Sequence, residues 1–426
     1  MASDIYILRM KGNLRRQDDL DRTFSIAILI PHVVLALDSL LFSLQNLMPF
    51  LPIGFISQLG KMIIALGYVY AFFKSSRMTS SLLFITISTC LLVAIISWML
   101  FPHNQSYLIP VIVRLILAAL PAFVFAYSVN DTVLFQAIMR KISYLIYFLA
   151  MAQTIVMFYD NPFVGNYSMA LSYSLMLPAL IALDDLFVKV TLKSSFVFVT
   201  SLMAILVFGS RGVLLSIAAF YLIYVVIRLV SASRNRFTEL IMLVIPFLVL
   251  FLRKNIIRVI MVLLPEKGQV SRTLNLFLKD NISLSGRDNI YLGLLEKIRE
   301  NPIMGIGIAG DRYLFGEPGL YAHNIFLEIV ADFGMIVGTV LIILLVYIAI
   351  KTVFVNSTIS NRLYLIWFCI GFVSLLVSSS YLESFRFWTF LGFSVRWLSN
   401  KQEATSRSAS LHEENDLAHI RKSRSC

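Results

Sequence analysis

The chain has 426 residues, of which 58% are hydrophobic and only 14% charged, and its mean hydropathy is +0.82. Soluble globular proteins contain roughly 45–50% apolar and 25% charged residues, so this composition excludes an ordinary soluble domain. The net charge of +12 could serve nucleic-acid binding. However, the Lys and Arg residues lie mostly in loops between apolar stretches and form no basic domain, which argues against that class of function.

Apolar stretches of about 20 residues recur along the chain, and this is the length that an α-helix needs to cross roughly 30 Å of hydrocarbon. We therefore predict an all-α, polytopic membrane protein with about twelve transmembrane helices. The predicted spans lie near residues 24–44, 53–73, 81–101, 107–127, 142–159, 167–187, 195–209, 213–230, 237–263, 323–350, 362–380 and 384–398.

These spans divide the chain into five regions. A polar segment at 1–23 precedes helices 1–9 within 24–264, and a long polar loop at 265–322 separates them from helices 10–12 within 323–398. The tail at 399–426, which is rich in Ser, Arg and Glu, is expected to be disordered.

Basic residues concentrate in alternate loops, on the side of the N-terminal segment, whereas the first three loops on the other side contain none. This asymmetry is the positive-inside rule. It predicts that the protein lies in the cytoplasmic (inner) membrane with both termini in the cytoplasm. The loop at 265–322 is then extracytoplasmic.

The middle of this loop predicts an amphipathic helix. A helix-start signal at Ser285–Asp288 precedes apolar residues at spacings of three and four, and Asn301-Pro302 ends the pattern. Such a helix can simply lie on the bilayer surface. Arg287, however, stands in the first turn, where a cation is unfavourable against the helix dipole, whereas free backbone amides and an arginine together bind anions. Its position suggests a phosphate ligand.

Residues Gly305–Gly310 match the pattern of a dinucleotide-binding turn, but they follow a helix instead of a strand and are expected to open no helix, so we exclude nucleotide binding. The glycines are expected to allow tight turns that return the loop to the membrane. The turn is followed by Tyr313, Phe315 and Tyr321, whose rings can stack on sugars or anchor the loop at the interface.

His323 stands at the mouth of a predicted span. A neutral imidazole there can act as a general base toward a hydroxyl, whereas capping of the helix by Asn324 is the structural alternative. Asn324, Glu328 and Asp332 follow at intervals of four and share one helix face. Two carboxylates in a membrane helix are costly unless they face protein or water, so they should line a cavity or pair with arginines.

Two further arginines lie in or beside spans. Arg211 is placed by the predicted topology at the outer side, and Arg114 lies inside the fourth span, where it needs either an anionic ligand or a partner such as Asp38 or Lys61. Together with Arg287 and His323 they have the chemistry of a lipid-phosphate site. Two arginines can bind a diphosphate and stabilise the charge that develops as it leaves, and no metal-binding pattern, phosphate-binding loop or nucleophile elbow is present.

In order and spacing, the motifs that carry these residues resemble the O-antigen ligase and Wzy-type polysaccharide polymerase superfamily. The motifs are Gly209-Ser210-Arg211-Gly212, Gly286-Arg287, Asn301-Pro302 with Gly305-Ile306-Gly307, and His323-Asn324-Ile325-Phe326-Leu327-Glu328 with Asp332-Phe333-Gly334.

The resemblance implies a GT-C-type glycosyltransferase that needs no metal or other cofactor and uses a glycan linked to undecaprenyl diphosphate. By position, Arg211 and Arg287 would bind the diphosphate and His323 would be the catalytic base. We expect Arg114, Asn324, Glu328, Tyr321 and Tyr313 to bind substrate. The expected partners are the lipid-linked donor and acceptor and membrane lipid, with a chain-length regulator and a flippase as further partners.

The shared motifs do not separate a polymerase, which joins lipid-linked repeats, from a ligase, which attaches the finished glycan to lipid A core. We favour the polymerase because the segment around Arg114 and residues 167–173 resemble the capsular polymerase branch. A polysaccharide-lipid transporter or flippase is the alternative that is not an enzyme. Against it stand the single long outer loop and the lack of paired discontinuous helices in two related halves.

Overall fold

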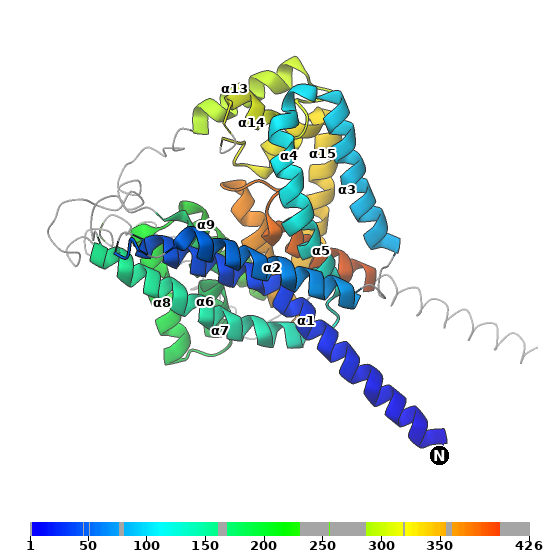
Figure 1. Cartoon of the computed structure of the whole chain (residues 1–426), viewed down its shortest axis with the longest axis vertical. Coiled ribbons are helices and arrows are strands. Elements are labelled where there is room, and N and C mark those ends of the chain that lie inside the picture. Colours follow the sequence, from blue (N-terminus) through cyan, green and yellow to red (C-terminus); the bar gives the residue numbers. More distant parts are fainter. Residues whose placement is uncertain are drawn as a thin grey trace, which may run out of the picture.

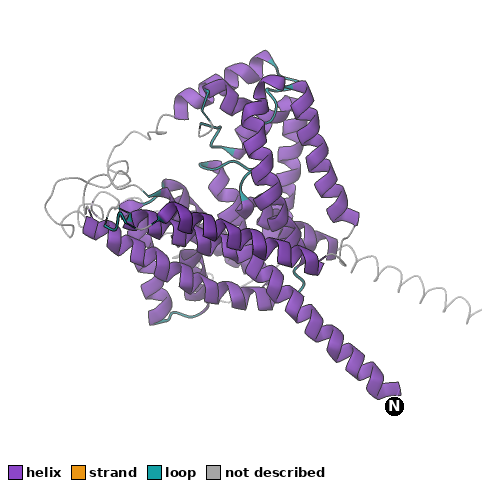
Figure 2. Ribbon diagram, in the orientation of Figure 1, coloured by secondary structure: helices purple, strands orange, loops and turns teal. Residues whose placement is uncertain are grey.

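The computed structural model describes residues 2–45, 47–50, 52–75, 81–160, 168–230, 255, 287–317, 320–354 and 360–400. Within these ranges the regular elements are all helices, and no β-strand is present (Figure 2). The all-α prediction is therefore confirmed. Apart from Asn255, the predicted span at 237–263 and the loop residues up to 286 lie outside the described residues, as does the tail from 401.

The helices follow one another through short connections. In chain order they are α1 (Ala2–Leu44), α2 (Ile53–Ser75), α3 (Ser81–Leu100), η1 (Pro102–Asn104), α4 (Gln105–Arg114), η2 (Leu115–Ala119), α5 (Leu120–Ser128), α6 (Thr132–Asp160), α7 (Met169–Val188), α8 (Leu192–Phe208), α9 (Arg211–Val230), α13 (Arg287–Glu300), α14 (Gly310–Phe315), α15 (Ile325–Phe354), α16 (Ser360–Trp367), η3 (Phe368–Phe372) and η4 (Val373–Leu376). A last helix covers residues 385–400.

Seven helices among the described residues are long and apolar enough to cross a membrane. They are Gln17–Leu44, Ile53–Lys74, Pro102–Ser128, Thr132–Tyr159, Met169–Val188, Arg211–Val230 and Ile325–Phe354. Shorter apolar helices lie at Phe84–Leu100, Leu192–Phe208 and Arg362–Leu376, where further spans were predicted. The chain is thus a multi-pass membrane protein, whereas the total of about twelve spans stays a prediction.

The outward-facing side chains agree with a membrane environment. Helix α2 exposes Phe55, Met62, Leu66 and Phe73 along its length. In water these large apolar side chains would be unfavourable, whereas the hydrocarbon of a bilayer solvates them.

The helices pack into one bundle in which α1 lies along α2 and α6, and α7 packs against α6 and α8 (Figure 1). Aromatic side chains fill its centre. The rings of Phe24 and Phe125 stack at 6.0 Å, and those of Phe135 and Phe393 meet edge to face at 4.9 Å. Because lipid tails are as apolar as these side chains, close packing holds the helices together more than the hydrophobic effect does.

Several helices are interrupted near one end of the bundle. Helix α15 breaks at Gly334, α4 passes into α5 through the π-helical turn η2, and residues 377–384 are irregular before the last helix. The span predicted at 107–127 thus corresponds to a continuous helical stretch, Pro102–Ser128, that contains a π-helical turn. At this same end α13 and α14 lie against α15 (Figure 1), so irregular backbone and loop helices meet there. Such interruptions leave polar backbone and side chains available for a site.

Candidate functional site

The glycine turn between α13 and α14 is tightly bent. Gly305 and Gly307 adopt φ values of +69° and +77°, which confirms that the glycines make tight turns. A side chain at Gly307 would overlap the ring of Phe101, so the close approach also requires glycine. The prediction that this segment opens no helix is wrong, because α14 begins at Gly310. Residues 287–300 before the turn are a helix and not a strand, so the exclusion of the dinucleotide-binding pattern stands.

This turn is bound to α15 where that helix breaks. The Ile306 N–H donates to the Ala331 carbonyl at 2.8 Å, and the Met335 N–H donates to the Pro302 carbonyl at 2.7 Å. Between them Gly334 has a φ of +75°, and a side chain there would overlap the Ile303 carbonyl. The glycine turn and the break in α15 therefore form one structural unit.

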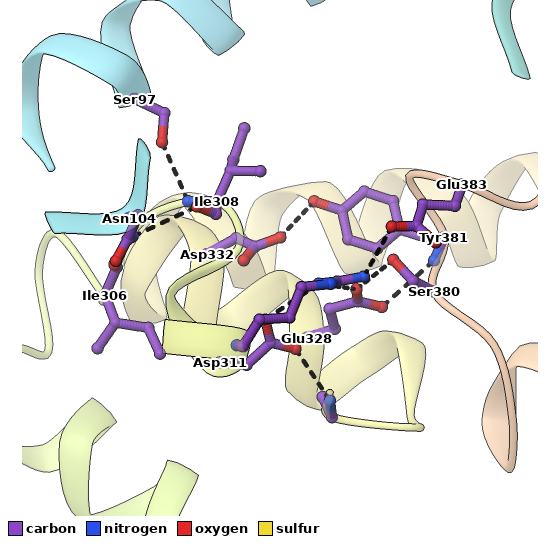
Figure 3. A network of polar contacts seen from close by, with 12 residues as sticks. Ser97, Asn104, Ile306, Ile308, Asp311, Glu328, Asp332, Ser380, Tyr381 and Glu383 are labelled. Atoms are coloured by element: carbon purple, nitrogen blue, oxygen red, sulfur yellow. Dashed lines mark hydrogen bonds and ion pairs between the residues drawn. The ribbon is translucent and has the colours of Figure 1, made fainter. Parts of the chain in front are cut away.

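The other side of the turn is held by the end of α3 and by η1 (Figure 3). The Asn104 amide donates to the Ile306 carbonyl at 2.8 Å, and the Ile308 N–H donates to the Ser97 hydroxyl at 3.1 Å. Asn104 and Ser97 are buried. Since buried hydrogen bonds of this kind are costly to break, the turn is fixed from two sides.

Helix α13 confirms the predicted amphipathic helix and places Arg287 at the site. Its buried face, Ile290, Leu294 and Ile298, packs in one apolar cluster with Ala322. This face therefore lies on protein and not on the bilayer surface alone. Among the residues that the structure describes, Arg287 forms no ion pair, and it is close enough to His323 for its charge to lower the pKa of the imidazole.

His323 is held in a strained and partly buried position directly before α15. Its φ is +52°, in the left-handed region, and its ring lies 3.9 Å from that of Tyr321, centroid to centroid. Burial and the positive charges of Arg287 and Arg312 lower the pKa of His323 to about 4. Its Nδ1 atom is buried and has no hydrogen-bond partner among the described residues. A neutral imidazole with a free nitrogen suits a proton acceptor.

Backbone strain is concentrated at this site. Within the described ranges the non-glycine residues with positive φ are Ala309, His323 and Ser379. Ser379 donates its N–H to the Tyr321 hydroxyl at 3.1 Å. Burial raises the pKa of Tyr321 to about 12, so this phenol stays protonated. Strained positions persist only where the surroundings hold them, and they cluster at functional sites.

A buried ion network around Arg312 positions the His323 segment. The Arg312 guanidinium pairs with Asp311 at 3.1 Å and with Glu383 at 3.3 Å, and it lies 5.3 Å from the Tyr321 ring centroid. The second Asp311 oxygen accepts the Ala322 N–H at 2.9 Å. Burial lowers the pKa of Arg312, but the neighbouring carboxylates raise it above the ordinary value, so this charge is permanent.

Glu328 and Asp332 are both buried on one face of α15 and bind residues 380–381 (Figure 3). Glu328 accepts hydrogen bonds from the Ser380 hydroxyl and from the Tyr381 N–H, and Asp332 accepts the Tyr381 hydroxyl at 2.7 Å. Glu328 also lies 3.8 Å from Arg312. The two carboxylates thus connect α15 to the irregular segment before the last helix, and Glu328 pairs with an arginine, as expected for intramembrane acids.

Arg114 has a partner that the sequence did not suggest. It pairs with Glu383 at 2.7 Å, and the second Glu383 oxygen pairs with Arg312. The suggestion of Asp38 or Lys61 as the partner is therefore wrong. The Arg114 side chain remains more than half exposed, so it retains donors that can reach a ligand.

Arg211 begins α9, next to the start of α7. The Ser210 N–H donates to the Ser172 hydroxyl at 2.9 Å, and a side chain on Gly212 would lie 3.2 Å from the Tyr173 hydroxyl. Tyr173 is in turn close enough to Tyr321 to affect its pKa. The structure therefore brings the start of α9 and the His323 segment to one site through Tyr173.

The remaining predicted residues lie at the edge of the site. Asn324 accepts the Phe326 and Leu327 N–H groups and donates to the Leu376 carbonyl, so it caps α15 as the structural alternative proposed. Tyr313 is half exposed, and its ring lies 4.8 Å from that of His103. Its exposed face can still stack on a sugar.

Sequence reasoning missed Asp311, Arg312, Glu383 and Arg386. The first two follow Gly310 directly, within the long polar loop predicted at 265–322, where charged residues are not unusual. The signal that could have found them is charge balance, because Arg114 and two membrane carboxylates needed partners. Altogether the site combines a neutral histidine, arginines at two helix starts and an interior held by buried ion pairs, which can bind a phosphorylated ligand and accept a proton.

Residues 196–343 match a family model described as O-Antigen ligase. The matched segment contains Arg211, Arg287, His323 and the glycine turn, so the resemblance seen in the sequence is confirmed over the part of the chain that forms the site. No curated protein and no solved structure matches the chain.

Proposed function

We propose, from the premise that residues 196–343 are an O-antigen ligase family domain, that this protein is a polysaccharide polymerase. It would transfer a glycan from undecaprenyl diphosphate onto the next lipid-linked repeat, without a metal ion, as a glycosyltransferase of the GT-C type. The observation that carries the proposal is the strained, neutral His323 held close to Arg287 and Arg312. A base beside fixed cations fits a reaction whose leaving group is a diphosphate.

The proposed step is a single displacement at the anomeric carbon of the donor. The acceptor hydroxyl gives its proton to His323 while its oxygen bonds to the anomeric carbon. The bond from that carbon to the diphosphate oxygen breaks, and the lipid diphosphate leaves with the electron pair. Arg211 and Arg287 would stabilise the charge on the leaving oxygens by charge-assisted hydrogen bonds.

Donor binding would also activate the base. Burial and the guanidinium groups of Arg287 and Arg312 lower the pKa of His323 to about 4. A bound diphosphate adds negative charge beside the same imidazole, which raises its pKa toward the operating pH. His323 would therefore become an effective base mainly when the donor is in place.

The site would open on the outer face of the cytoplasmic membrane, with both termini inside. Support comes from the opposite ends of the helices, where Lys189 and Lys193 flank the connection between α7 and α8 and Lys351 lies in the last turn of α15. Positive residues mark cytoplasmic loops. Periplasmic tags read by a membrane-impermeant reagent test this topology.

A ligase that transfers glycan to lipid A core is the second candidate, because the family model that matches is described as O-Antigen ligase. The polymerase is favoured by the resemblance of the Arg114 segment and of residues 167–173 to capsular polymerases. The two candidates differ in the acceptor and not in the treatment of the donor.

The decisive experiment incubates purified protein in detergent with synthetic undecaprenyl-diphosphate repeat unit and EDTA. A ladder of products that is lost in His323→Ala supports the polymerase. Transfer that occurs only after addition of lipid A core identifies a ligase. If neither occurs while vesicles containing the protein move the lipid-linked repeat across their bilayer, the protein is a flippase and the proposal is wrong.

A further inference from the structure

Arg386 is a charged side chain inside the bundle that the proposed reaction has not used. It lies in the first turn of the last helix, 385–400. Its Nε and Nη2 atoms are inaccessible to solvent and have no hydrogen-bond partner among the described residues. A cation in the first turn opposes the helix dipole, and no ion pair between Arg386 and an acid is found among the described residues.

The surroundings of Arg386 point toward the site. Its guanidinium carbon lies 5.1 Å from the ring centroid of Tyr173 and 5.0 Å from that of Phe385. The Tyr173 hydroxyl borders Gly212, directly after Arg211. Arg386 and the start of α9, which carries Arg211, therefore both lie beside Tyr173, and that tyrosine is close to Tyr321 beside His323.

Ring contacts alone leave part of this charge unsatisfied. The Nε2 atom of His32 is also buried without a partner among the described residues, and the His32 ring lies 4.9 Å from the Phe385 ring. Two buried donor or acceptor groups on α1 and on the last helix thus lack partners in one region. By contrast, Arg114 and Arg312 both pair with Glu383. Intramembrane arginine is stable when it meets an anion, and here a ligand can supply it.

We propose that Arg386 binds a phosphate group of the lipid-linked substrate, as a guanidinium additional to Arg211 and Arg287. This inference rests on the proposed function, since it assigns a contact of the same donor. Arg386 would hold the phosphate nearer the membrane interior, while Arg287 and His323 act at the phosphate nearer the sugar. The ligand chemistry is a phosphate ester within the membrane, which a phospholipid headgroup could also provide.

The test measures binding of undecaprenyl diphosphate, without sugar, to the full-length protein in detergent by native mass spectrometry. Arg386→Gln should raise the Kd at least about tenfold, because a charge-assisted hydrogen bond is lost. Arg386→Lys keeps the charge but not the bidentate geometry and should have an intermediate Kd. The matched control is Arg396→Gln on the same helix, because Arg396 bonds to Asn130 instead; its Kd should be unchanged.

The outcomes separate the sources of the phosphate and the two proposals. If Arg386→Gln and Arg386→Lys melt like the wild type and bind undecaprenyl diphosphate equally well, the inference is wrong. The inference is also wrong if the Arg386 variants bind undecaprenyl diphosphate like the wild type but retain less copurified phosphatidylglycerol, because Arg386 then holds a structural lipid. If Arg386→Gln loses binding of undecaprenyl diphosphate while the wild-type protein binds it but makes no glycan product, the Arg386 site is supported and the proposed polymerase is overturned.

Discussion

Two groups of arginine side chains lie toward opposite ends of α7 and differ in how they are satisfied. Far from the site, Arg140 pairs with Asp184 at 3.2 Å and with Asp185 at 2.9 Å, and Arg362 pairs with Asp184 at 3.3 Å. We call these four residues the clasp. It joins α6, α7 and α16, and each charge in it meets an opposite one.

At the site end of α7 not every charge that the structure describes is paired with an opposite one. Arg287 has no ion pair among the described residues, it lies near another potential cation, His323, and the Nδ1 atom of that histidine has no partner there. Strained backbone is found at His323 and not in the clasp. Saturated charges hold helices together, whereas unsatisfied ones mark a place for a ligand.

The test with the largest expected effect replaces one residue of each region by alanine, in two separate variants. His323→Ala should lower the transfer rate by about 10²–10⁴, because the general base is lost, and leave the melting temperature almost unchanged. Arg140→Ala should do the reverse, lowering the free energy of unfolding by about 1 kcal/mol while the protein that remains folded keeps its rate. Product ladders and thermal unfolding of the same preparations measure both. A clasp variant that is inactive although folded would break the comparison.

The second test concerns Arg287, which forms no ion pair among the described residues. Arg287→Ala should reduce kcat by about 10²–10³, because a cation that stabilises the leaving diphosphate is removed. In cells, lipid-linked single repeats should accumulate at the outer face. Arg299→Ala is the matched control, since Arg299 is exposed in the last turn of the same helix, and it should behave like the wild type.

How much of this could be read from the sequence depends on the range of the interactions. The apolar helices, the amphipathic helix and the glycine turns depend on local periodicity and backbone preference, and the structure bears them out within the described residues, whereas the total of about twelve spans stays a prediction. Local pattern also singled out Arg287 and His323, because a cation at a helix start and a histidine at the mouth of a span are unusual.

The ion-pair partners of the charged residues could not be predicted from local sequence patterns. Glu383 bonds to Arg114 and Arg312, which lie 269 and 71 residues away. Periodicity contains no information on such contacts, so Arg114 was assigned the wrong partners. The break at Gly334, inside the span predicted at 323–350, was missed for a related reason. It is stabilised by hydrogen bonds from the glycine turn, whereas the sequence that follows Gly334 is apolar and resembles an uninterrupted helix.

The third test addresses the anchoring of the glycine turn. Gly334→Ala should lower the free energy of unfolding by at least about 2 kcal/mol, since it combines positive φ with overlap on the Ile303 carbonyl. Gly316→Ala has a similar φ of +70° but meets nothing within 4 Å, so it should cost about 1 kcal/mol or less. Thermal unfolding in detergent measures the difference. Equal losses would mean that α15 does not depend on its contact with the turn.

The smallest expected effect, a shift in pH dependence, probes how the substrate changes the site. The pKa of His323 is lowered to about 4, so the neutral base is present above this pH and lost as the pH falls through it. The acid limb of kcat/KM, which reports the free enzyme, should lie near pH 4, whereas that of kcat should lie at higher pH because the bound diphosphate offsets the arginine charges. In Arg287→Gln the limb of kcat/KM should itself move up, by less than about one pH unit, because burial remains the larger cause of the lowered pKa. Arg299→Gln is the control and should leave the acid limbs of kcat/KM and of kcat in place. If these two limbs coincide in the wild type, the diphosphate does not lie beside His323.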